Sequence, residues 1–274
     1  MSEKEKGTNN SRFREIISVL RKHNITRGLS PKKLRLIMED LGPTFVKIGQ
    51  IMALHSDILP KAYCDELMEL CTDARPMPFE EAVSVIDESY GRSWKKVFSS
   101  IEETPIGSAS IAQVHRAVLK SGEEVVVKIQ RKGIYEMMAR DIEFIRKAIK
   151  LMPPISLKGM ADFDLVLDEL WSVTRDEMNF LTEASNIEEF ARRNKDVNFV
   201  QTPVLYQQYT TVHVLVMEYI DGCGIDEKDK LLEDGYDLKE IGSKLVDNYI
   251  KQVMDDGFFH ADPHSGNVKI RDGK

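Results

Sequence analysis

The stretch HADPHSGN, residues 260–267, is the part of the sequence whose residue types and spacing point most directly to chemistry. His260, Asp262 and Asn267 fit the pattern H-x-D-x-x-x-x-N of a phosphotransferase catalytic loop. In that loop the aspartate orients or deprotonates the attacking hydroxyl, and the asparagine five residues later holds a metal ion between nucleotide phosphates. The motif therefore suits phosphoryl transfer.

Two other interpretations of this stretch compete with a catalytic loop. His260 and His264 have the spacing of zinc ligands on a helix face, but Pro263 and Gly266 argue against a helix here. An ordinary polar turn is the second alternative, and the motif alone leaves it open. In a catalytic loop the two histidines would serve as scaffolding.

A lysine interrupts the apolar run VVVKIQ, residues 125–130. Strand alternation places Lys128 on one face with Val126 and Gln130, and the other apolar side chains on the opposite face. From this run alone, the better interpretation is a lysine that extends from an edge strand to solvent. The functional alternative is the strand lysine that binds nucleotide phosphates in the V-A-I-K pattern.

The stretch GSASIAQV, residues 107–114, lies where a kinase has its phosphate loop G-x-G-x-x-G-x-V. Alanine stands at two of the three glycine positions. Because alanine does not readily take positive φ and its methyl group limits backbone approach, the sequence predicts a modified loop. The candidate nucleotide-binding residues are Gly107, Ser108, Ala109, Ser110, Ala112 and Val114.

A nucleotide site of this kind needs two further pieces, a carboxylate for the lysine and a hinge for the base. Glu169, Glu177 and Glu183 are candidates for the carboxylate, although Glu183 taken alone is most simply an exposed helical glutamate. The apolar run HVLVMEYIDG leads into Glu218 and Ile220 and is a weak signal for the hinge, where backbone groups bind adenine.

The elements that position these residues follow from periodicity and turn signals. The first hundred residues are predicted to be helical, ending in a short, weaker helix at SWKKVFSSI. A β-hairpin follows, SIAQVHRAVLK and EEVVVKIQRK, around a tight Ser121–Gly122 turn. After it come a helix through Ile149, one long helical segment over 162–194, a strand pair near VQTPVLYQQYT and TVHVLVMEYI, and an amphipathic helix ending at Gly257.

Composition limits the class of protein. The chain of 274 residues has 42% hydrophobic and 30% charged residues, as in a soluble globular protein, and its formal net charge of −7 gives no reason to expect nucleic-acid binding. The three cysteines lack C-x-x-C spacing, which favours a reducing, cytoplasmic location. The polar N-terminus excludes a secretory signal peptide, and no apolar run is long enough to span a membrane.

Taken together, several motifs in a fixed order carry a resemblance to a known family. FVKIGQ contains K-x-G-Q, with Lys47 and Gln50, and ASIAQVHRA, VVVKIQRKGI and HADPHSGN follow it. Over about residues 30–270 the chain closely resembles the UbiB/AarF (ABC1/ADCK-type) family of atypical protein-kinase-like ATPases. The resemblance implies an α+β protein-kinase-like fold with a helical N-terminal extension packed on the N-lobe.

The expected organisation has four parts: a polar segment, 1–30; a helical extension with K-x-G-Q, 31–103; a kinase-like N-lobe, 104–222; and the start of a C-lobe with the catalytic loop, 223–274. The family's D-F-G or D-L-G metal motif would follow Lys274, so the chain is expected to be truncated and incomplete for catalysis. ATPase or atypical kinase activity is expected of the complete protein.

The resemblance also implies residue roles and ligands, ATP or ADP with Mg²⁺. The K-x-G-Q helix would lie over the nucleotide pocket and block access for a protein substrate. Asn179 stands where the family's E-x-D motif has aspartate. Asparagine brings no charge, and it would therefore weaken metal binding or the K-x-G-Q contact. The implied catalytic residues are Asp262, Lys128 and Glu183, the metal ligands are Asn267 and Glu177, and the nucleotide contacts include Lys47, Gln50, Lys128, Glu218 and Ile220.

The implied biology is quinone or other membrane-lipid metabolism. Partners would be a lipid or quinone precursor and a membrane surface, reached through the part of the protein after Lys274, so that the complete protein is peripheral to the membrane. Two alternatives stay open. One is a small-molecule phosphotransferase of the aminoglycoside or choline kinase kind, which shares H-x-D-x-x-x-x-N; the other is a catalytically inactive nucleotide-binding module.

Overall fold

A five-stranded antiparallel sheet forms the centre of the protein. The computed structural model describes residues 3–53, 56, 59–70, 76–151, 163–261 and 265–274. The strand order is β1-β3-β4-β5. The short strand β2 pairs with Gln113 and Val114 of β3, a part of β3 that β1 does not reach. The strands are β1 (Phe98–Ile101), β2 (Gly107–Ser108), β3 (Ala112–Leu119), β4 (Glu124–Gln130) and β5 (Val214–Glu218).

The predicted hairpin is confirmed as β3 and β4. Their β-branched residues favour extended backbone, and Gly122 takes φ 106° in the turn, a conformation that glycine adopts without strain. Lys128 pairs with Val114 of β3 and with Leu215 of β5. The lysine therefore lies on an interior strand, and the edge-strand interpretation is wrong.

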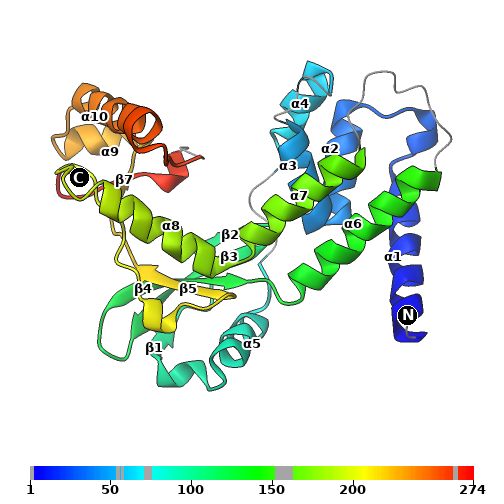
Figure 1. Ribbon diagram of the computed structural model, residues 1–274, viewed down its shortest axis with the longest axis horizontal. Helices are drawn as coiled ribbons and strands as arrows, with labels where there is room; N and C mark the ends of the chain where they lie inside the picture. The colour runs from blue at the N-terminus through cyan, green and yellow to red at the C-terminus, as the bar shows by residue number, and fades with distance from the viewer. Residues whose placement is uncertain (1–2, 54–55, 57–58, 71–75, 152–162, 262–264) are drawn as a thin grey trace.

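The two faces of the sheet pack against different helices (Figure 1). Val125, Val127 and Ile129 form a buried cluster with helix α5 (Phe79–Tyr90), as the predicted alternation requires. On the opposite face Leu215 packs with residues of α8 (Phe180–Arg193), and this is the face that carries Lys128. Both faces therefore carry buried clusters, and the α8 side also holds the candidate chemistry.

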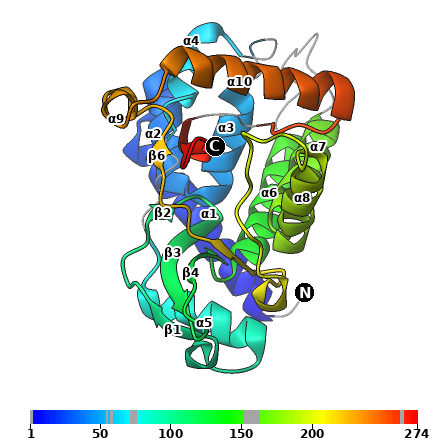
Figure 2. The same cartoon turned by 90° about the vertical axis from the view of Figure 1, so that its left-hand side faces the viewer.

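The N-terminal extension is helical, as predicted. It comprises α1 (Glu3–Lys22), η1 (Ile25–Arg27), α2 (Pro31–Leu41), α3 (Pro43–Ala53) and α4 (Lys61–Leu67). Ser30 caps α2 with Pro31 at its first turn, and Gly42 at φ 93° ends it. Ile48 and Ile51 of α3 pack against α6 (Ile134–Leu151) and α7 (Phe163–Glu177). Figure 2 shows α6 and α7 side by side, next to the extension.

Three predicted elements differ in the structure. SWKKVFSSI is not a helix but a 3₁₀ turn, η2 (Trp94–Lys96), followed by β1, so the sheet begins before the boundary expected at 104. The long helical segment is divided into α7 and α8, because the Asn179 side chain caps a new helix. The first strand of the expected pair is a loop with η3 (Gln207–Tyr209) and a single bridge between Leu205 and Met217.

The elements after the sheet lie at the opposite end of the molecule from the extension (Figure 1). They are β6 (Cys223–Gly224), α9 (Lys228–Glu233), α10 (Leu238–Lys251), the π-helix η4 (Gln252–Asp256), η5 (Ser265–Asn267) and β7 (Lys269–Ile270). Asp237 caps α10, and Gly257 at φ 60° ends the helical stretch as predicted. Among the described residues, no helix has the length and apolar character that crossing a membrane requires.

Candidate nucleotide-binding site

An ion pair between β4 and α8 is the centre of the candidate site. The ammonium group of Lys128 donates to both carboxylate oxygens of Glu183, at 2.7 and 2.9 Å. The side chains are 26% and 34% exposed, so solvent reaches both members of the pair. Phe180, which begins α8, places its ring 5.1 Å from the same ammonium group. Of the three candidate glutamates, the structure brings Glu183 to the lysine.

The alanine-rich loop connects β2 to β3 near this pair. Ala109 N donates to Ala112 O at 2.8 Å and closes the loop, and Val114 on β3 pairs with Lys128. A side chain built at Gly107 would meet no atom within 4 Å. Packing therefore does not require glycine at this position. Because Gly107 has no side chain, open space remains beside the loop.

The K-x-G-Q helix turns its polar stripe toward the protein. Lys47 Nζ lies 2.7 and 2.8 Å from the carboxylate oxygens of Glu177 at the end of α7, and the lysine side chain is only 18% exposed. Thr44 is fully buried and donates to Asp141 at 2.7 Å, while Gln50 is partly buried. Glu177 therefore supplies the negative charge that this largely buried lysine needs.

The glycine of K-x-G-Q has a packing role. A Cβ atom at Gly49 would lie 2.3 Å from Leu70 Cδ1 and 2.5 Å from Met38 Sδ. Both neighbours belong to a buried cluster of the extension. Glycine at this position lets α3 approach α2 and the residues after α4 closely.

Asn179, at the place of the family's aspartate, is the N-cap of α8. Its Oδ1 atom accepts a hydrogen bond from Leu181 N at 3.1 Å, which satisfies one of the free amides at the helix start. Glu183 lies in the first turn of this helix. The cap therefore fixes where α8 begins and, with it, the position of the glutamate that meets Lys128.

The predicted hinge connects the sheet to the C-terminal elements. Glu218 accepts from Val204 N at 3.1 Å and from Arg271 Nη2 at 2.9 Å. The carbonyl oxygen of Ile220 accepts from Lys269 Nζ at 3.0 Å. Arg271 and Lys269 of the C-terminal segment thus contact both predicted hinge residues, and sequence reasoning did not anticipate these contacts.

The predicted catalytic loop is described only in part. Asp262 lies outside the described residues, as do Pro263 and His264. Asn267 is exposed on η5, and His260 donates its backbone N–H to Gln252 Oε1 at 3.0 Å, which suits scaffolding. Within the described part of the chain, no three His, Cys, Asp or Glu residues form a group that could hold a metal ion.

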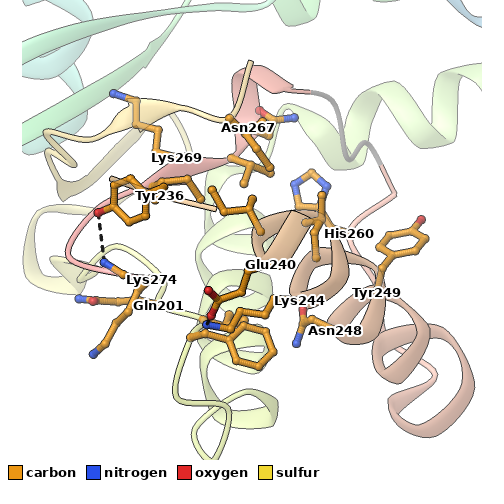
Figure 3. A pocket seen from close by; sticks show the side chains of 18 of the residues that line it. Gln201, Tyr236, Glu240, Lys244, Asn248, Tyr249, His260, Asn267, Lys269 and Lys274 are labelled. Carbon is orange, nitrogen blue, oxygen red and sulfur yellow. Dashed lines mark hydrogen bonds and ion pairs between the residues drawn. The ribbon is translucent and has the colours of Figure 1, made fainter. Parts of the chain in front are cut away.

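A cavity of about 340 Å³ lies on the C-terminal side of the molecule (Figure 3). Tyr236, Lys244 and Asn248 line it from the α10 side, and Asn267 reaches it from η5. Lys128 and Glu183 are not among its lining residues. The cavity is therefore distinct from the phosphate site suggested by the ion pair.

Protein kinases hold nucleotide phosphates with a strand lysine that is paired with a helix glutamate, beneath a loop between two strands. The same arrangement on this sheet defines a protein-kinase-like domain. Residues 69–274 match the family model described as the ABC1 atypical kinase-like domain. The chain belongs to the UbiB/ABC1 family of atypical kinase-like proteins, which confirms the resemblance drawn from its motifs.

Similar proteins are known from bacteria and plants. The chain is 45% identical, over 89% of its length, to an uncharacterized protein in the hydrogenase 1 5′ region of Clostridium pasteurianum, and covers 46% of it. It is 39% identical, over 93% of its length, to Protein ACTIVITY OF BC1 COMPLEX KINASE 8, chloroplastic, of Arabidopsis thaliana, and covers 33% of it. Identity is 36%, over 87% of the chain and 45% of the relative, to a probable protein kinase UbiB of Pseudomonas fluorescens.

A solved structure supports the fold. The structure of Rv3197 from Mycobacterium tuberculosis, in complex with erythromycin, matches with a TM-score of 0.60 and 28% identity. The match covers 82% of this chain and 56% of that one. The α+β kinase-like fold is thereby confirmed. The chain spans less than half the length of each of the three sequence relatives.

Proposed function

We propose that this chain binds ATP or ADP through Lys128, as the nucleotide-binding part of an atypical kinase-like ATPase. The observation that carries the proposal is the paired contact of Lys128 with Glu183, on the face of the sheet that packs against α8. The contact holds the ammonium group in a fixed place before any ligand arrives. A phosphate would then meet a pre-positioned charge, and a charge-assisted hydrogen bond of this kind is strong.

The residues around the pair fit a nucleotide. The space beside Gly107 would admit phosphate oxygens next to the loop backbone, and the adjacent candidates Ser108 and Ser110 carry hydroxyl groups. Mg²⁺, when bound, would neutralise phosphate charge. Asn267 and Asp262 are the proposed oxygen ligands on the catalytic-loop side, as the sequence motif implies. Glu177 is a weaker metal candidate, because its carboxylate is paired with Lys47.

We further propose that the extension keeps protein substrates away from the site. The ion pair from Lys47 of α3 to Glu177 ties the K-x-G-Q helix to the end of α7, immediately before the helix that carries Glu183. A segment tied there would cover the approach to Lys128. Hydrolysis of ATP, or transfer to a small acceptor, is therefore proposed instead of phosphorylation of proteins.

Binding of MgATP and MgADP to purified chain, measured by calorimetry, tests the nucleotide site. Lys128→Ala is expected to weaken binding by about tenfold or more, because it removes a charge-assisted phosphate contact. Lys120→Ala is the matched control, since Lys120 is exposed in the turn of the same hairpin. Equal affinities for wild type and Lys128→Ala would rule out the site as proposed.

This chain spans less than half the length of each relative, so catalysis is tested in a protein of the relatives' full length. Asp262→Asn should abolish ATP hydrolysis while nucleotide binding remains. Appearance of phosphorylated choline or aminoglycoside with the wild type would favour the small-molecule phosphotransferase instead. Equal hydrolysis by wild type and Asp262→Asn would remove the catalytic role of the aspartate and leave a nucleotide-binding module.

The cellular role we propose is support of quinone or other membrane-lipid metabolism at a membrane surface. The support is the resemblance of the chain to a probable protein kinase UbiB. Deleting the gene and restoring it with wild type or with Lys128→Ala, followed by quantification of cellular quinones and lipids, tests this role. Identical profiles for the deletion and its wild-type parent would contradict it.

A further inference from the structure

Arg131 makes contacts along the alanine-rich loop, and sequence reasoning did not single it out. Its Nε atom donates to Ala109 O at 2.9 Å, and its Nη2 atom donates to Ser108 Oγ at 2.8 Å. Its backbone N–H donates to Ile111 O at 2.8 Å. One residue thus contacts both sides of the loop tip between β2 and β3.

The position of Arg131 in the fold makes these contacts informative. Arg131 directly follows β4, the strand that carries Lys128, and so lies at the end of an interior strand with pairing on both sides. The loop, in contrast, leads out of β2, a strand of only two residues. Arg131 therefore joins a short, weakly held segment to the rigid element that positions the phosphate-binding lysine.

The guanidinium group is suited to this task. Its planar fork presents two donors in fixed directions, which match a carbonyl oxygen and a hydroxyl oxygen on adjacent residues. A lysine would offer a single point of contact on a flexible stem. Burial lowers the pKa of Arg131, and the negative charge of Glu81 opposes that effect. The group stays protonated, because arginine does not lose its charge in proteins.

We propose that Arg131 is a positioning residue that holds the alanine-rich loop at a fixed height above Lys128. It acts through Ser108 and Ala109 and does not itself contact phosphate. Its consequence for nucleotide binding rests on the proposed function; its effect on the loop does not. The fixed loop would present the space at Gly107 in one shape, so that a phosphate binds without first ordering the backbone.

Hydrogen exchange of the nucleotide-free chain, read by mass spectrometry on peptides covering 106–114, tests the positioning role directly. Arg131→Lys keeps the charge and removes the fork, and we expect exchange in this peptide to become about tenfold faster or more. Arg35→Lys is the matched control, because Arg35 also donates to two side chains, Glu39 and Glu66, but lies in the extension. It should leave the loop peptide unchanged.

Ser108→Ala removes one acceptor while Arg131 stays intact, and it provides a second route to the same answer. It should also speed exchange in the loop peptide, and the double variant should show less than the sum of the two effects. Unchanged loop exchange in both single variants would overturn the proposal, as would additive effects.

Nucleotide affinity separates this inference from the proposed function. Arg131→Lys should weaken MgADP binding several-fold together with the faster loop exchange. Weaker binding with unchanged exchange would mean that Arg131 contacts phosphate directly, and the positioning role would be wrong. If the wild type binds no nucleotide, the proposed function fails, while the exchange result still decides whether Arg131 holds the loop.

Discussion

The contact between Lys128 and Glu183 is made by two partly exposed side chains. An ion pair with this much solvent access contributes little to stability, about 0–1 kcal/mol. Its distances of 2.7 and 2.9 Å nevertheless hold the ammonium group against one carboxylate. A well-defined contact of small energetic value is consistent with the proposed role of Glu183, which is to orient the lysine for a ligand.

Glu183→Gln separates orientation from stability. We expect the thermal unfolding midpoint to change by only a few degrees, since the pair is worth about 1 kcal/mol at most. MgATP affinity should fall several-fold, because Lys128 loses its charged partner. Glu189→Gln on the same helix is the control, because Glu189 pairs with Arg192 and Arg193 and not with Lys128. Hydrogen bonds from these two arginines lower the pKa of Glu189 to about 2. Equal affinity losses in both variants would contradict the assignment.

Gly107→Ala tests the open space beside the loop. The added methyl group meets no atom within 4 Å, so the folded state should tolerate it, and a smaller unfolded-state entropy should stabilise the chain by up to about 1 kcal/mol. Nucleotide affinity should fall, because the methyl group fills the space proposed for phosphate. Gly242→Ala in α10, which also meets no atom, should stabilise without affecting affinity. A Gly107→Ala variant with wild-type affinity would place the phosphates elsewhere.

At the scale of elements, the most informative packing is that of α3 on the rest of the extension. Gly49→Ala places a methyl group among buried side chains of Met38 and Leu70, both of which would have to shift. Overpacking costs about 1–3 kcal/mol, and the better helix propensity of alanine offsets about 1 kcal/mol of that. We expect a net loss of about 1 kcal/mol in urea unfolding. A variant as stable as wild type would show that this cluster can adjust.

The helices and the hairpin could be predicted from the sequence, because their periodicity extends over enough residues to be distinctive. β1 could not, since Phe98–Ile101 is too short to show alternation and owes its conformation to pairing with β3. The break between α7 and α8 was also missed, although asparagine favours helix caps, because apolar periodicity continues on both sides of Asn179.

The candidate site could be predicted in part, where a residue stands out from the pattern around it. Lys128 stands out because a charge interrupts an apolar strand, whereas the choice of Glu183 among three glutamates depends on where α8 begins. The contacts of Arg131 could not be predicted, because a basic residue after a strand is common and its partners lie on a different hairpin segment. Sequence patterns single out candidate residues, and the fold determines which of these residues are in contact.

For the whole molecule, a buried polar network joins the extension to the kinase-like domain. Asp141 of α6 is 1% exposed and accepts from Arg12 of α1 at 2.9 and 2.8 Å and from Thr44 of α3 at 2.7 Å. Three helices from distant parts of the sequence therefore depend on one carboxylate. Removing it would leave a buried hydroxyl and a half-buried guanidinium without this partner.

Asp141→Ala is accordingly expected to destabilise the chain by about 3 kcal/mol, which is typical for breaking a buried charged contact. Urea unfolding measures the loss, and hydrogen exchange should show it in α1 and α3 before the sheet. Asp40→Ala is the control, because Asp40 pairs with Lys22 and His23 at the surface, and it should change little. A small effect of Asp141→Ala would mean that the extension is held by its apolar contacts alone.

His115 makes the stability of the whole molecule dependent on pH. The ring is fully buried beneath the sheet; Nδ1 lies 2.7 Å from the carbonyl oxygen of Glu102, and Nε2 lies 2.6 Å from Gln113 Nε2. A carbonyl oxygen can only accept, so Nδ1 carries the proton and Nε2 accepts from the amide. Burial lowers the pKa of His115, opposed by the hydrogen bond to Glu102, and the imidazole is neutral in the folded state.

The unfolded chain, with the ordinary histidine pKa of 6.5, binds the proton first as the pH falls. Stability should therefore be complete above about pH 6.5 and decrease as the pH falls from there toward the lowered pKa of the folded state. Urea unfolding at pH 7.5, 6.5 and 5.5 measures this slope, in a range where carboxylates contribute little. His115→Gln should lower stability at pH 7.5 and flatten the slope; a slope equal to that of wild type would assign the pH dependence to another group.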